Sequence, residues 1–429
     1  MLKLNKGDSM EEKERALLVG VNINDDEYFF KEVNELRELA KACNMEPVEL
    51  VVQNLSSINS AFYVGVGKLD EIKDKIKELD IDIVIFNNEL TPSQLKNIEQ
   101  KLDIAVLDKT ALILEIFNIR AKTKEAKLQV EVARLKYMLP RLVGLHKALG
   151  RQGGGSGLSN KGSGEKKIEL DRRIIEARIS KLNKELEQIS KTRETQSKQR
   201  EKSSIPLVSM VGYTNAGKST LLNDFVELSG EDEDKKVFEE DMLFATLETS
   251  VRKIKLKDNK EFLLSDTVGF IKSLPHELIK AFRSTLEEVK HADLLLHVID
   301  FSDDDYEENI RVTENTLKII GAQDIPVIYV YNKSELKKEK FPVVSDNSIY
   351  ISAKNKIGIY ELLELINKSI FKGYKSCCML IPYDKGNILS FFNEMYNIKN
   401  TDYLEEGTKI EFDCSLKDYD KYKEYLIEE

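Results

Sequence analysis

Short apolar runs alternate with amphipathic stretches over the first 115 residues. The apolar runs cover residues 16–21, 48–52, 81–86 and 104–107. Between them, the spacing of the apolar residues predicts helices over 28–43, 68–79 and 92–101. Buried strands that alternate with helices are typical of a parallel sheet. The pattern therefore predicts a small parallel α/β domain at the N-terminus, over residues 1–118.

From residue 123 the apolar positions follow a helical period. They recur at steps of four and three at Leu128, Val132, Leu135, Leu139 and Leu142, and again at Ile175, Ile179, Leu182, Leu186 and Ile189. Between these segments, 7 of the 15 residues in 150–164 are Gly. Because an interior Gly costs ~1 kcal/mol relative to Ala, we expect no helix to cross that stretch. The pattern predicts an antiparallel helical hairpin with a flexible tip over residues 119–203.

The second half of the chain returns to a β/α pattern. This pattern covers residues 204–371 and is expected to form a third domain. Two further strands are predicted at 377–383 and 409–414, each followed by a helix-like stretch. We therefore expect an α/β chain that ends in a small α+β domain over residues 372–429.

Composition agrees with a globular protein, since 41% of the residues are apolar and 33% are charged. Residues 1–15 are charged where a signal peptide would need an apolar core. No apolar run approaches the ~18 residues that span a bilayer. We therefore expect a cytoplasmic protein without an integral membrane segment, and peripheral association with a membrane stays open.

The cysteines and histidines suggest no metal site. Of Cys43, Cys377, Cys378 and Cys414, only the adjacent pair is close in sequence, and no CxxC spacing occurs. Neither a zinc site nor a disulfide framework is indicated, so buried thiols are expected. The four histidines are scattered, and no chemistry is assigned to them.

The net charge of −10 conceals a basic segment. Residues 120–202 hold 22 Lys+Arg against 10 Asp+Glu, whereas the rest of the chain holds 43 against 65. This asymmetry predicts that a polyanion is contacted by one element only. The basic residues in and beside the Gly-rich tip are Arg151, Lys161, Lys166 and Lys167. A flexible linker without a binding role is the alternative interpretation of this tip.

A phosphate-binding loop follows the strand predicted at 205–211. The sequence GYTNAGKS matches G-x-x-x-x-G-K-[ST], with its two glycines free to curl backbone amides around phosphates. Lys218 supplies a cation at the β- and γ-phosphates, and the Ser219 hydroxyl is a ligand for Mg²⁺. The residues expected to line the phosphates are Gly212, Tyr213, Thr214, Asn215, Ala216, Gly217, Lys218, Ser219 and Thr220.

Three later motifs indicate that the base of the bound nucleotide is guanine. The first is DTVG, in which Asp266 is expected to hold Mg²⁺ through water and the Gly269 amide to sense the γ-phosphate. The second is NKSE, where the Glu335 carboxylate can accept hydrogen bonds from guanine and the Lys333 stem packs on the base. The third is ISAK, where a backbone amide can meet the base oxygen. These motifs add Thr267, Val268, Asn332, Ser352, Ala353 and Lys354 to the expected site. Together they predict a Mg²⁺-dependent GTPase.

The segment FATLETS is expected to form a switch that responds to the γ-phosphate. Thr246 would complete the Mg²⁺ shell in the GTP state, with Phe244 and Ala245 beside the nucleotide, and Thr249 is the alternative. Lys218, Thr246 and Gly269 are thus the expected catalytic residues. Phe270 stands where Ras-like enzymes have a water-orienting Gln, which predicts slow intrinsic turnover. Asn215 matches a pattern of GTPases that use K⁺, although an Asn bonded to its own loop is an equal alternative.

With these residues in place, the chain resembles the HflX family, GTPases of the Obg-HflX group within the translation-factor class. The resemblance covers nearly the whole chain. It rests on TPSQLKNIEQKLDIAVLDKTALILEIF at 91–117, TKEAKLQVEVARLKYMLPRL at 123–142 and GSGEKKIELDRRIIEARI at 162–179. FATLETS and DTVGFI also follow the family. Two positions depart from it: Glu335 replaces the usual Asp, and the tip reads SNKGSGE rather than Arg-Gly-Pro-Gly-Glu.

The resemblance implies four domains, with the GTPase domain third, and a monomer that binds GTP, GDP and Mg²⁺. It also implies binding to the large ribosomal subunit, with the hairpin tip near the peptidyl-transferase region, and no role on DNA. GTP-bound protein would then split stalled or idle ribosomes during stress. The alternatives are a GTPase of ribosome assembly, a partner in RNA modification, and an RNA-remodelling protein that uses ATP.

Overall fold

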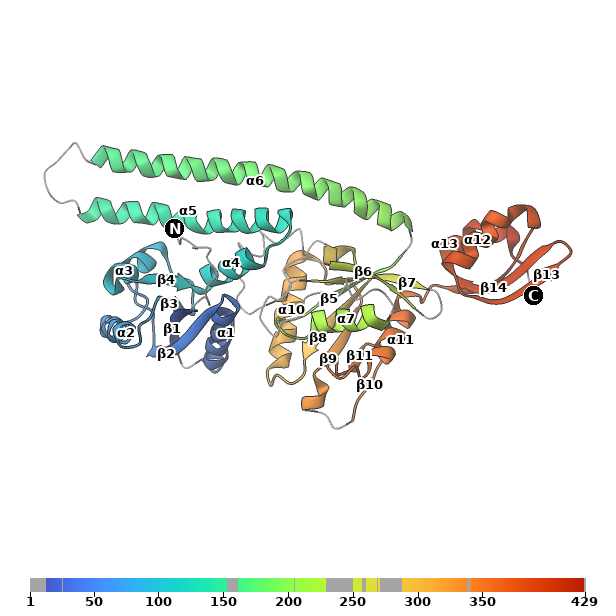
Figure 1. Ribbon diagram of the computed structural model, residues 1–429, viewed down its shortest axis with the longest axis horizontal. Helices are drawn as coiled ribbons and strands as arrows, with labels where there is room; N and C mark the ends of the chain where they lie inside the picture. The colour runs from blue at the N-terminus through green and yellow to red at the C-terminus, as the bar shows by residue number, and fades with distance from the viewer. Residues whose placement is uncertain are drawn as a thin grey trace. The chain divides into compact units, whose positions relative to one another are not determined.

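The computed structural model describes residues 13–24, 26–152, 161–203, 205–228, 250–256, 260–267, 269–270, 288–337 and 340–427. These residues form two compact units, one up to Glu194 and the other from Thr195 onward. Figure 1 labels the elements of each unit. The chain is a mixed α/β protein, as its sequence predicts.

The first unit contains a parallel four-stranded sheet in the order β2-β1-β3-β4, which confirms the predicted N-terminal fold. Its strands are β1 (Glu14–Ile23), β2 (Met45–Leu55), β3 (Ile83–Phe86) and β4 (Ala105–Asp108). Its helices are α1 (Phe29–Ala42), α2 (Val66–Glu78), α3 (Pro92–Leu102) and α4 (Lys109–Arg120). Helices α2 and α3 pack on the sheet, and their buried residues join the strand residues in one core cluster.

Local chemistry explains where α3 begins. Thr91 caps the helix, because its side chain accepts a hydrogen bond from the Gln94 amide while the Gln94 side chain accepts one from the Thr91 amide. Pro92 occupies the first helical position, where a missing N–H costs nothing. In the segment 65–68, GVGK, only Gly65 precedes α2, as its N-cap, and the other three residues lie in the first turn of the helix.

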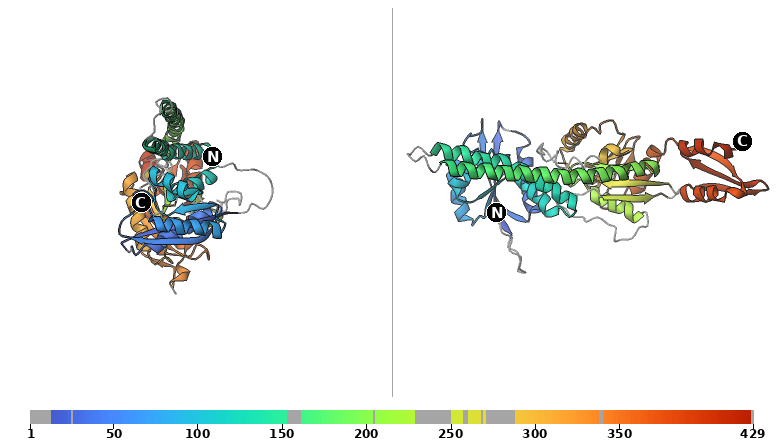
Figure 2. Two further views of the ribbon diagram at one scale, coloured as in Figure 1. Left: turned by 90° about the vertical axis from the view of Figure 1, so that its left-hand side faces the viewer. Right: turned by 90° about the horizontal axis from the view of Figure 1, so that it is seen from above.

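Two long helices, α5 (Lys124–Gln152) and α6 (Lys161–Ser203), follow the N-terminal sheet. Within the first unit they run side by side in Figures 1 and 2. Leu128 and Val132 of α5 pack against Leu182 of α6, and Arg178 forms an ion pair with Glu131 at 2.8 Å. The heptad pattern therefore predicts the contact between the two helices correctly.

The helices extend farther into the Gly-rich stretch than the sequence predicts. Gly150 lies within α5, and Gly162 and Gly164 lie within α6. The expectation that 150–164 excludes helix is therefore wrong at both ends. Extending an existing helix by one residue needs no new nucleation, so a cost of ~1 kcal/mol per Gly does not stop it immediately.

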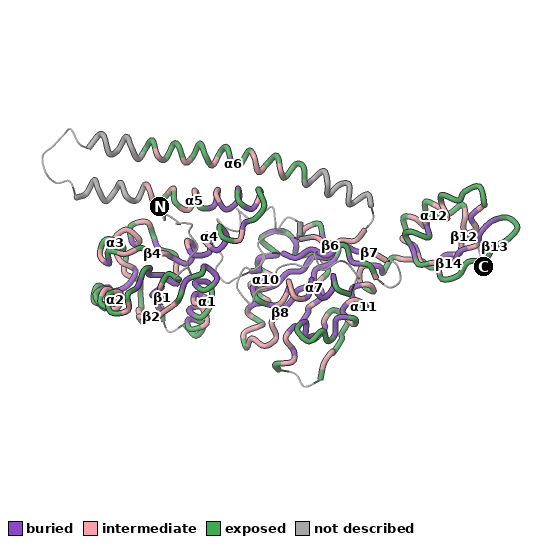
Figure 3. Tube along the Cα trace, in the orientation of Figure 1, coloured by how far each residue is buried: buried purple, intermediate pink, exposed green. Residues whose placement is uncertain are grey.

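The second unit contains a seven-stranded sheet in the order β10-β11-β9-β8-β5-β7-β6. The central strands are parallel, and β6 and β10 pair antiparallel at the two edges. The strands are β5 (Leu207–Val211), β6 (Ser250–Lys255), β7 (Glu261–Asp266), β8 (Leu294–Asp300), β9 (Val327–Asn332), β10 (Val343–Val344) and β11 (Ser348–Tyr350). The helices are α7 (Lys218–Leu228), η2 (Glu288–His291), α10 (Tyr306–Ile320), η3 (Ser334–Leu336) and α11 (Ile359–Ile370). Figure 3 shows buried residues concentrated along the central strands.

The unit ends in a three-stranded antiparallel sheet in the order β12-β14-β13, which confirms the expected small α+β fold. Its elements are β12 (Lys375–Ile381), η4 (Tyr383–Lys385), α12 (Gly386–Met395), β13 (Ile398–Leu404), β14 (Gly407–Cys414), α13 (Leu416–Lys421) and η5 (Lys423–Tyr425). The sulfur atoms of Cys377 and Cys414 lie 3.4 Å apart in its core. The expected burial of the thiols is confirmed for Cys43, Cys377 and Cys414, whereas Cys378 is only half-buried.

Among the helices of the described residues, none is long and apolar enough to cross a bilayer. The predicted domain boundaries at residues 118, 203 and 371 stay predictions.

Candidate nucleotide site

The loop between β5 and α7 can be built only with glycine at its two ends. Gly212 has a φ of +150°, and a Cβ there would lie 2.1 Å from the Val298 carbonyl oxygen. Gly217 has a φ of +91°, and a Cβ there would lie 2.2 Å from Asn332 Nδ2. Real Cβ atoms do not approach so closely, and both φ values favour glycine. The loop therefore curves tightly from β5 into α7.

Lys218 lies inside this curve as the first residue of α7. Its side chain is 7% exposed, and Nζ donates hydrogen bonds to the carbonyl oxygens of Gly212, at 3.1 Å, and Tyr213, at 2.8 Å. Burial lowers the pKa of Lys218 to about 8, and the nearby Asp266 carboxylate partly opposes that shift. A phosphate group beside this buried ammonium would raise the pKa again, because it stabilises the charged form.

Ser219 and Asp266 converge next to Lys218. The Ser219 hydroxyl donates a hydrogen bond to Asp266 Oδ2 at 3.1 Å, and Asp266 is fully buried as the last residue of β7. A hydroxyl and a carboxylate are hard oxygen ligands of the type that Mg²⁺ prefers. The position of this pair beside the loop fits a Mg²⁺ ion held between protein and phosphates. Thr267 donates a hydrogen bond to the Met210 carbonyl at 2.6 Å, which fixes the start of the DTVG segment.

The end of the DTVG segment lies directly on the phosphate loop. The Thr214 amide donates to the Phe270 carbonyl at 2.8 Å, and the Phe270 amide donates to the Gly212 carbonyl at 3.1 Å. A Cβ on Gly269 would lie 2.8 Å from the Thr214 Cα and 3.1 Å from Lys218 Nζ. The Gly269 backbone is therefore next to the buried lysine.

The Phe270 side chain points into the core rather than toward the loop. It is 3% exposed and belongs to a hydrophobic cluster with Val211, Val289 and Leu295. An apolar ring packed in this way cannot orient a water molecule.

Asn332 connects the phosphate loop to the ISAK segment. It is the last residue of β9 and is 3% exposed. Its Nδ2 donates to the Ala216 carbonyl at 3.0 Å, and its Oδ1 accepts from the Ala353 amide at 2.9 Å. One buried amide side chain thus holds together two loops that are far apart in the sequence.

The residues expected to bind the base surround Asn332. Lys333 has a φ of +60°, and its Nζ donates to Asp300 Oδ2 at 2.7 Å. Glu335 is half-buried in η3, and its buried Oε2 accepts no hydrogen bond among the described residues. Since a buried carboxylate oxygen is costly without a donor, the N–H groups of a guanine ring suit this position. Ser352 is fully buried and Ala353 is 2% exposed.

The remaining predicted residues divide into three groups. Tyr213 and Thr220 are half-buried in the loop and α7, whereas Asn215, with a φ of +60°, and Lys354 are exposed. Phe244, Ala245, Thr246, Thr249 and Val268 lie outside the described residues. Arg151 lies in the last turn of α5, and Lys161, Lys166 and Lys167 lie in the first turns of α6, but the description covers only their backbone. In the part of the chain that is described, no three His, Cys, Asp or Glu residues gather as a metal site.

The sequence gives no sign of His297, which lies in β8 near Lys218. It is 1% exposed, and its ring centroid is 5.6 Å from that of Tyr329. Burial lowers the pKa of His297 to about 3, and the positive charge of Lys218 adds to this effect. His297 is therefore neutral at physiological pH.

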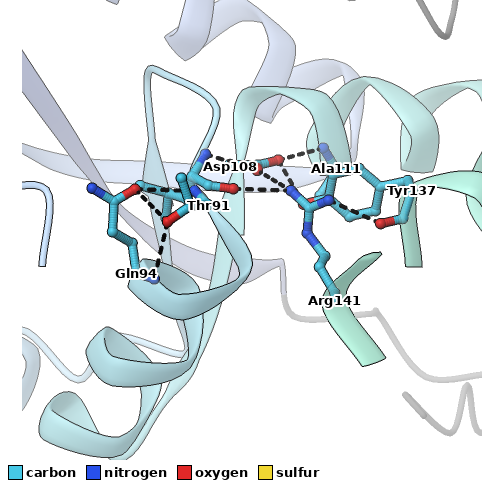
Figure 4. A network of polar contacts seen from close by, with 7 residues as sticks. Thr91, Gln94, Asp108, Ala111, Tyr137 and Arg141 are labelled. Atoms are coloured by element: carbon cyan, nitrogen blue, oxygen red, sulfur yellow. Dashed lines mark hydrogen bonds and ion pairs between the residues drawn. The ribbon is translucent and has the colours of Figure 1, made fainter. Parts of the chain in front are cut away.

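The sequence also gives no sign of a buried polar network around Asp108 in the first unit (Figure 4). Asp108 is fully buried and caps α4 by accepting a hydrogen bond from the Ala111 amide at 2.8 Å. It also accepts from the Leu90 amide at 3.1 Å, from the Tyr137 hydroxyl at 2.8 Å and from Arg141 at 2.9 Å. The Arg141 guanidinium lies 3.3 Å from the Tyr137 ring centroid. This network fastens α5 to the carboxyl ends of β3 and β4.

Three family models match consecutive parts of the chain. The model described as GTP-binding GTPase N-terminal matches residues 31–118, and GTP-binding GTPase Middle Region matches 120–200. The model described as 50S ribosome-binding GTPase matches residues 207–333, which include the phosphate loop and Asn332.

Curated relatives are similar over nearly the whole chain. The chain is 47% identical to GTPase HflX of Caldanaerobacter subterraneus subsp. tengcongensis, over 97% of this chain and 96% of the relative. It is 42% identical to GTPase HflX of Lacrimispora saccharolytica, over 92% of each. It is 36% identical to GTPase HflX of Escherichia coli K12, over 94% of this chain and 93% of the relative.

Proposed function

This chain belongs to the HflX family of GTPases, and from that premise we propose that it binds the large ribosomal subunit and separates stalled or idle ribosomes. It binds GTP and hydrolyses it to GDP and phosphate. The observation that supports the proposal most is that the site beside Lys218 lies in the segment matched by the family described as 50S ribosome-binding GTPase.

We assign the phosphates to the loop from Gly212 to Thr220. The Lys218 ammonium and the loop amides would stabilise negative charge as water attacks the γ-phosphorus in line. Ser219 and Asp266 would hold Mg²⁺, which when bound neutralises charge on the β- and γ-phosphate oxygens. Lys218→Ala should abolish hydrolysis, measured as phosphate release.

The response to the γ-phosphate is assigned to Gly269 and Thr246. The Gly269 amide would contact the γ-phosphate, and Thr246 would complete the Mg²⁺ shell in the GTP state only. Because Phe270, directly after DTVG, is hydrogen-bonded to the loop at Gly212 and Thr214, contact of the Gly269 amide with the γ-phosphate would also shift the loop and DTVG together. GTP and GDP would therefore favour different arrangements of the switch.

The base is assigned to the residues around Asn332. Glu335 would accept hydrogen bonds from guanine N–H groups, and the Lys333 stem would pack on the base plane. Adenine lacks these donors, so GTP is preferred to ATP. The Ser352 to Lys354 segment would offer an amide to the base oxygen.

Turnover is proposed to be slow until a ribosomal partner supplies the water-orienting group that Phe270 cannot provide. Phosphate release should therefore rise when large subunits are added, and an unchanged rate would contradict this idea. Asn215 is exposed in the loop and is the candidate for K⁺ coordination. Comparing rates in KCl and NaCl tests it, and equal rates would leave Asn215 a loop residue only.

The hairpin is proposed to contact ribosomal RNA through Arg151, Lys161, Lys166 and Lys167. The excess of 22 basic over 10 acidic residues in 120–202 supports this assignment. If the GTP-bound state binds the large subunit more tightly than the GDP-bound state does, the difference in binding free energy drives subunit separation.

Sedimentation of intact ribosomes tests the proposed function. With a non-hydrolysable GTP analogue, the protein should convert intact ribosomes into free subunits and sediment with the large one. GDP and the Lys218→Ala variant are the controls, and both should leave ribosomes intact. Binding to immature subunits alone would instead indicate a role in ribosome assembly.

A further inference from the structure

The second unit carries basic charge that the sequence count along the chain conceals. Residues 250–260 hold five Lys+Arg against one Asp, and residues 366–375 hold three Lys and no acidic residue. The two segments are far apart in the sequence. However, β6, β7 and α11 pack on one core, where Ile254 and Phe262 join Leu362 and Ile366. The fold thus brings Lys260, at the end of the first segment, close to Lys368 and Lys372 of the second.

A groove of about 390 Å³ lies where these segments meet. Its lining residues come from the start of β7 and the carboxyl end of α11, and are Lys260, Glu364, Asn367, Lys368, Phe371 and Lys372. Three of the six are lysines, and one is acidic. The lining thus has a net positive charge within a unit of the chain that is acidic elsewhere.

Aromatic rings hold one of these lysines in place. Lys260 Nζ lies 5.3 Å from the ring centroid of Phe371 and 5.4 Å from that of Tyr374. A ring face attracts an ammonium group electrostatically, and Phe371 is 7% exposed and thus firmly packed. Lys368, near the end of α11, and Lys372, in the turn that follows it, are both exposed and line the groove. The groove therefore presents one lysine held beside aromatic rings and two exposed lysines.

We propose that this groove binds the sugar-phosphate backbone of RNA, as a second contact apart from the hairpin. Lysine ammonium groups bind phosphate as point charges, and the Asn367 amide can bond to a phosphate or a 2′-hydroxyl group. The proposal rests on the proposed function, because the large ribosomal subunit supplies the RNA. It adds a second candidate contact to the hairpin predicted from the charge distribution.

The test compares two triple variants of the full chain that lose equal charge. Lys260→Gln/Lys368→Gln/Lys372→Gln removes the groove lysines. The control, Lys318→Gln/Lys340→Gln/Lys385→Gln, removes three exposed lysines elsewhere in the same unit. Binding of a short fluorescein-labelled single-stranded RNA is followed by anisotropy over a range of KCl concentrations. GDP affinity should be unchanged in both variants.

The groove variant should bind the RNA more weakly and with less dependence on salt. Each lost phosphate contact lowers the slope of log affinity against log salt by about 0.7, so three contacts lower it by about 2. The control should keep the wild-type slope. Changing the four hairpin residues to Gln should reduce affinity further when combined with the groove variant, since the two sites are separate.

Three outcomes would overturn the proposal. The first is an equal slope for the groove and control variants. The second is a groove variant that keeps the wild-type salt dependence of RNA affinity but binds polyglutamate more weakly, which would assign the groove to an acidic protein. The third is a groove variant that keeps the wild-type salt dependence of RNA affinity but no longer binds inorganic phosphate, which would indicate a site for free phosphate. If the wild-type protein does not split ribosomes but the groove variant shows the reduced salt dependence of RNA affinity, the result counts against the proposed function and not against the groove.

Discussion

The burial of His297 predicts how the stability of the nucleotide-binding unit depends on pH. The pKa of this imidazole is about 3 in the folded protein against an ordinary value of 6.5. Above pH 6.5 the side chain is neutral in both the folded and the unfolded state, so it contributes no pH dependence. Below pH 6.5 only the unfolded state takes up the proton, until both states are protonated below about pH 3. Stability therefore falls as pH decreases through this window.

The magnitude follows from the two pKa values. Each pH unit between 6.5 and 3 lowers the free energy of unfolding by about 1.4 kcal/mol, so at pH 5 it is about 2 kcal/mol lower than at neutral pH. The side chain is 1% exposed, so solvent screening does not reduce this value much. Replacing His297 by Phe keeps a flat ring against Tyr329 and removes the titrating group. Between pH 7.5 and pH 5, the free energy of unfolding of the variant should therefore fall by about 2 kcal/mol less than that of the wild type.

Urea denaturation followed by circular dichroism measures the effect at both pH values. The relevant transition is the one that added GDP shifts to higher urea, because ligand binding stabilises only the unit that holds the site. His291→Gln is the matched control, since His291 is exposed, and it should follow the wild type. If His297→Phe loses as much stability as the wild type, His297 is not the buried neutral base described above.

Three further predictions concern Asp108, Gly217 and Glu335. Asp108→Asn leaves the Arg141 guanidinium without its carboxylate and should lower the free energy of unfolding, measured by urea denaturation, by about 3–5 kcal/mol. The loss should be smaller when Arg141→Met is added to this variant. Losses that simply add in the double variant would contradict the pairing. Gly217→Ala places a methyl group 2.2 Å from an asparagine nitrogen and should weaken GDP binding at least tenfold by calorimetry. Gly67→Ala is its control, because nothing lies within 4 Å of the added methyl. Glu335→Ala should weaken GTP binding roughly 10–100-fold while Glu335→Asp does not, and equal affinity for all three proteins would refute the role in guanine binding.

The sequence predicts the parts of the fold that depend on local pattern. The apolar runs that become β1 to β4, and the Gly-rich loop between β5 and α7, are visible because neighbours in the chain determine them. Strand ends could also be predicted, so Asp266 and Asn332 lie where their motifs suggest. The roles assigned to these side chains stay predictions.

Features that depend on distant packing could not be predicted. His297 and Asp108 resemble ordinary polar residues at strand positions, and only the surrounding elements bury them. The groove between Lys260 and Lys368 likewise joins two segments that share no sequence motif. Local propensity was misleading at Gly162, which is helical because an adjoining helix extends over it.

Asn332 makes the two ends of the nucleotide site thermodynamically dependent on each other. Its single side chain bonds to the phosphate loop at Ala216 and to the ISAK segment, which we assign to the base, at Ala353. A ligand that orders one loop therefore lowers the entropy cost of ordering the other. Guanosine and pyrophosphate, offered as separate fragments, should each bind more tightly when the other is present, by an equal factor in both directions.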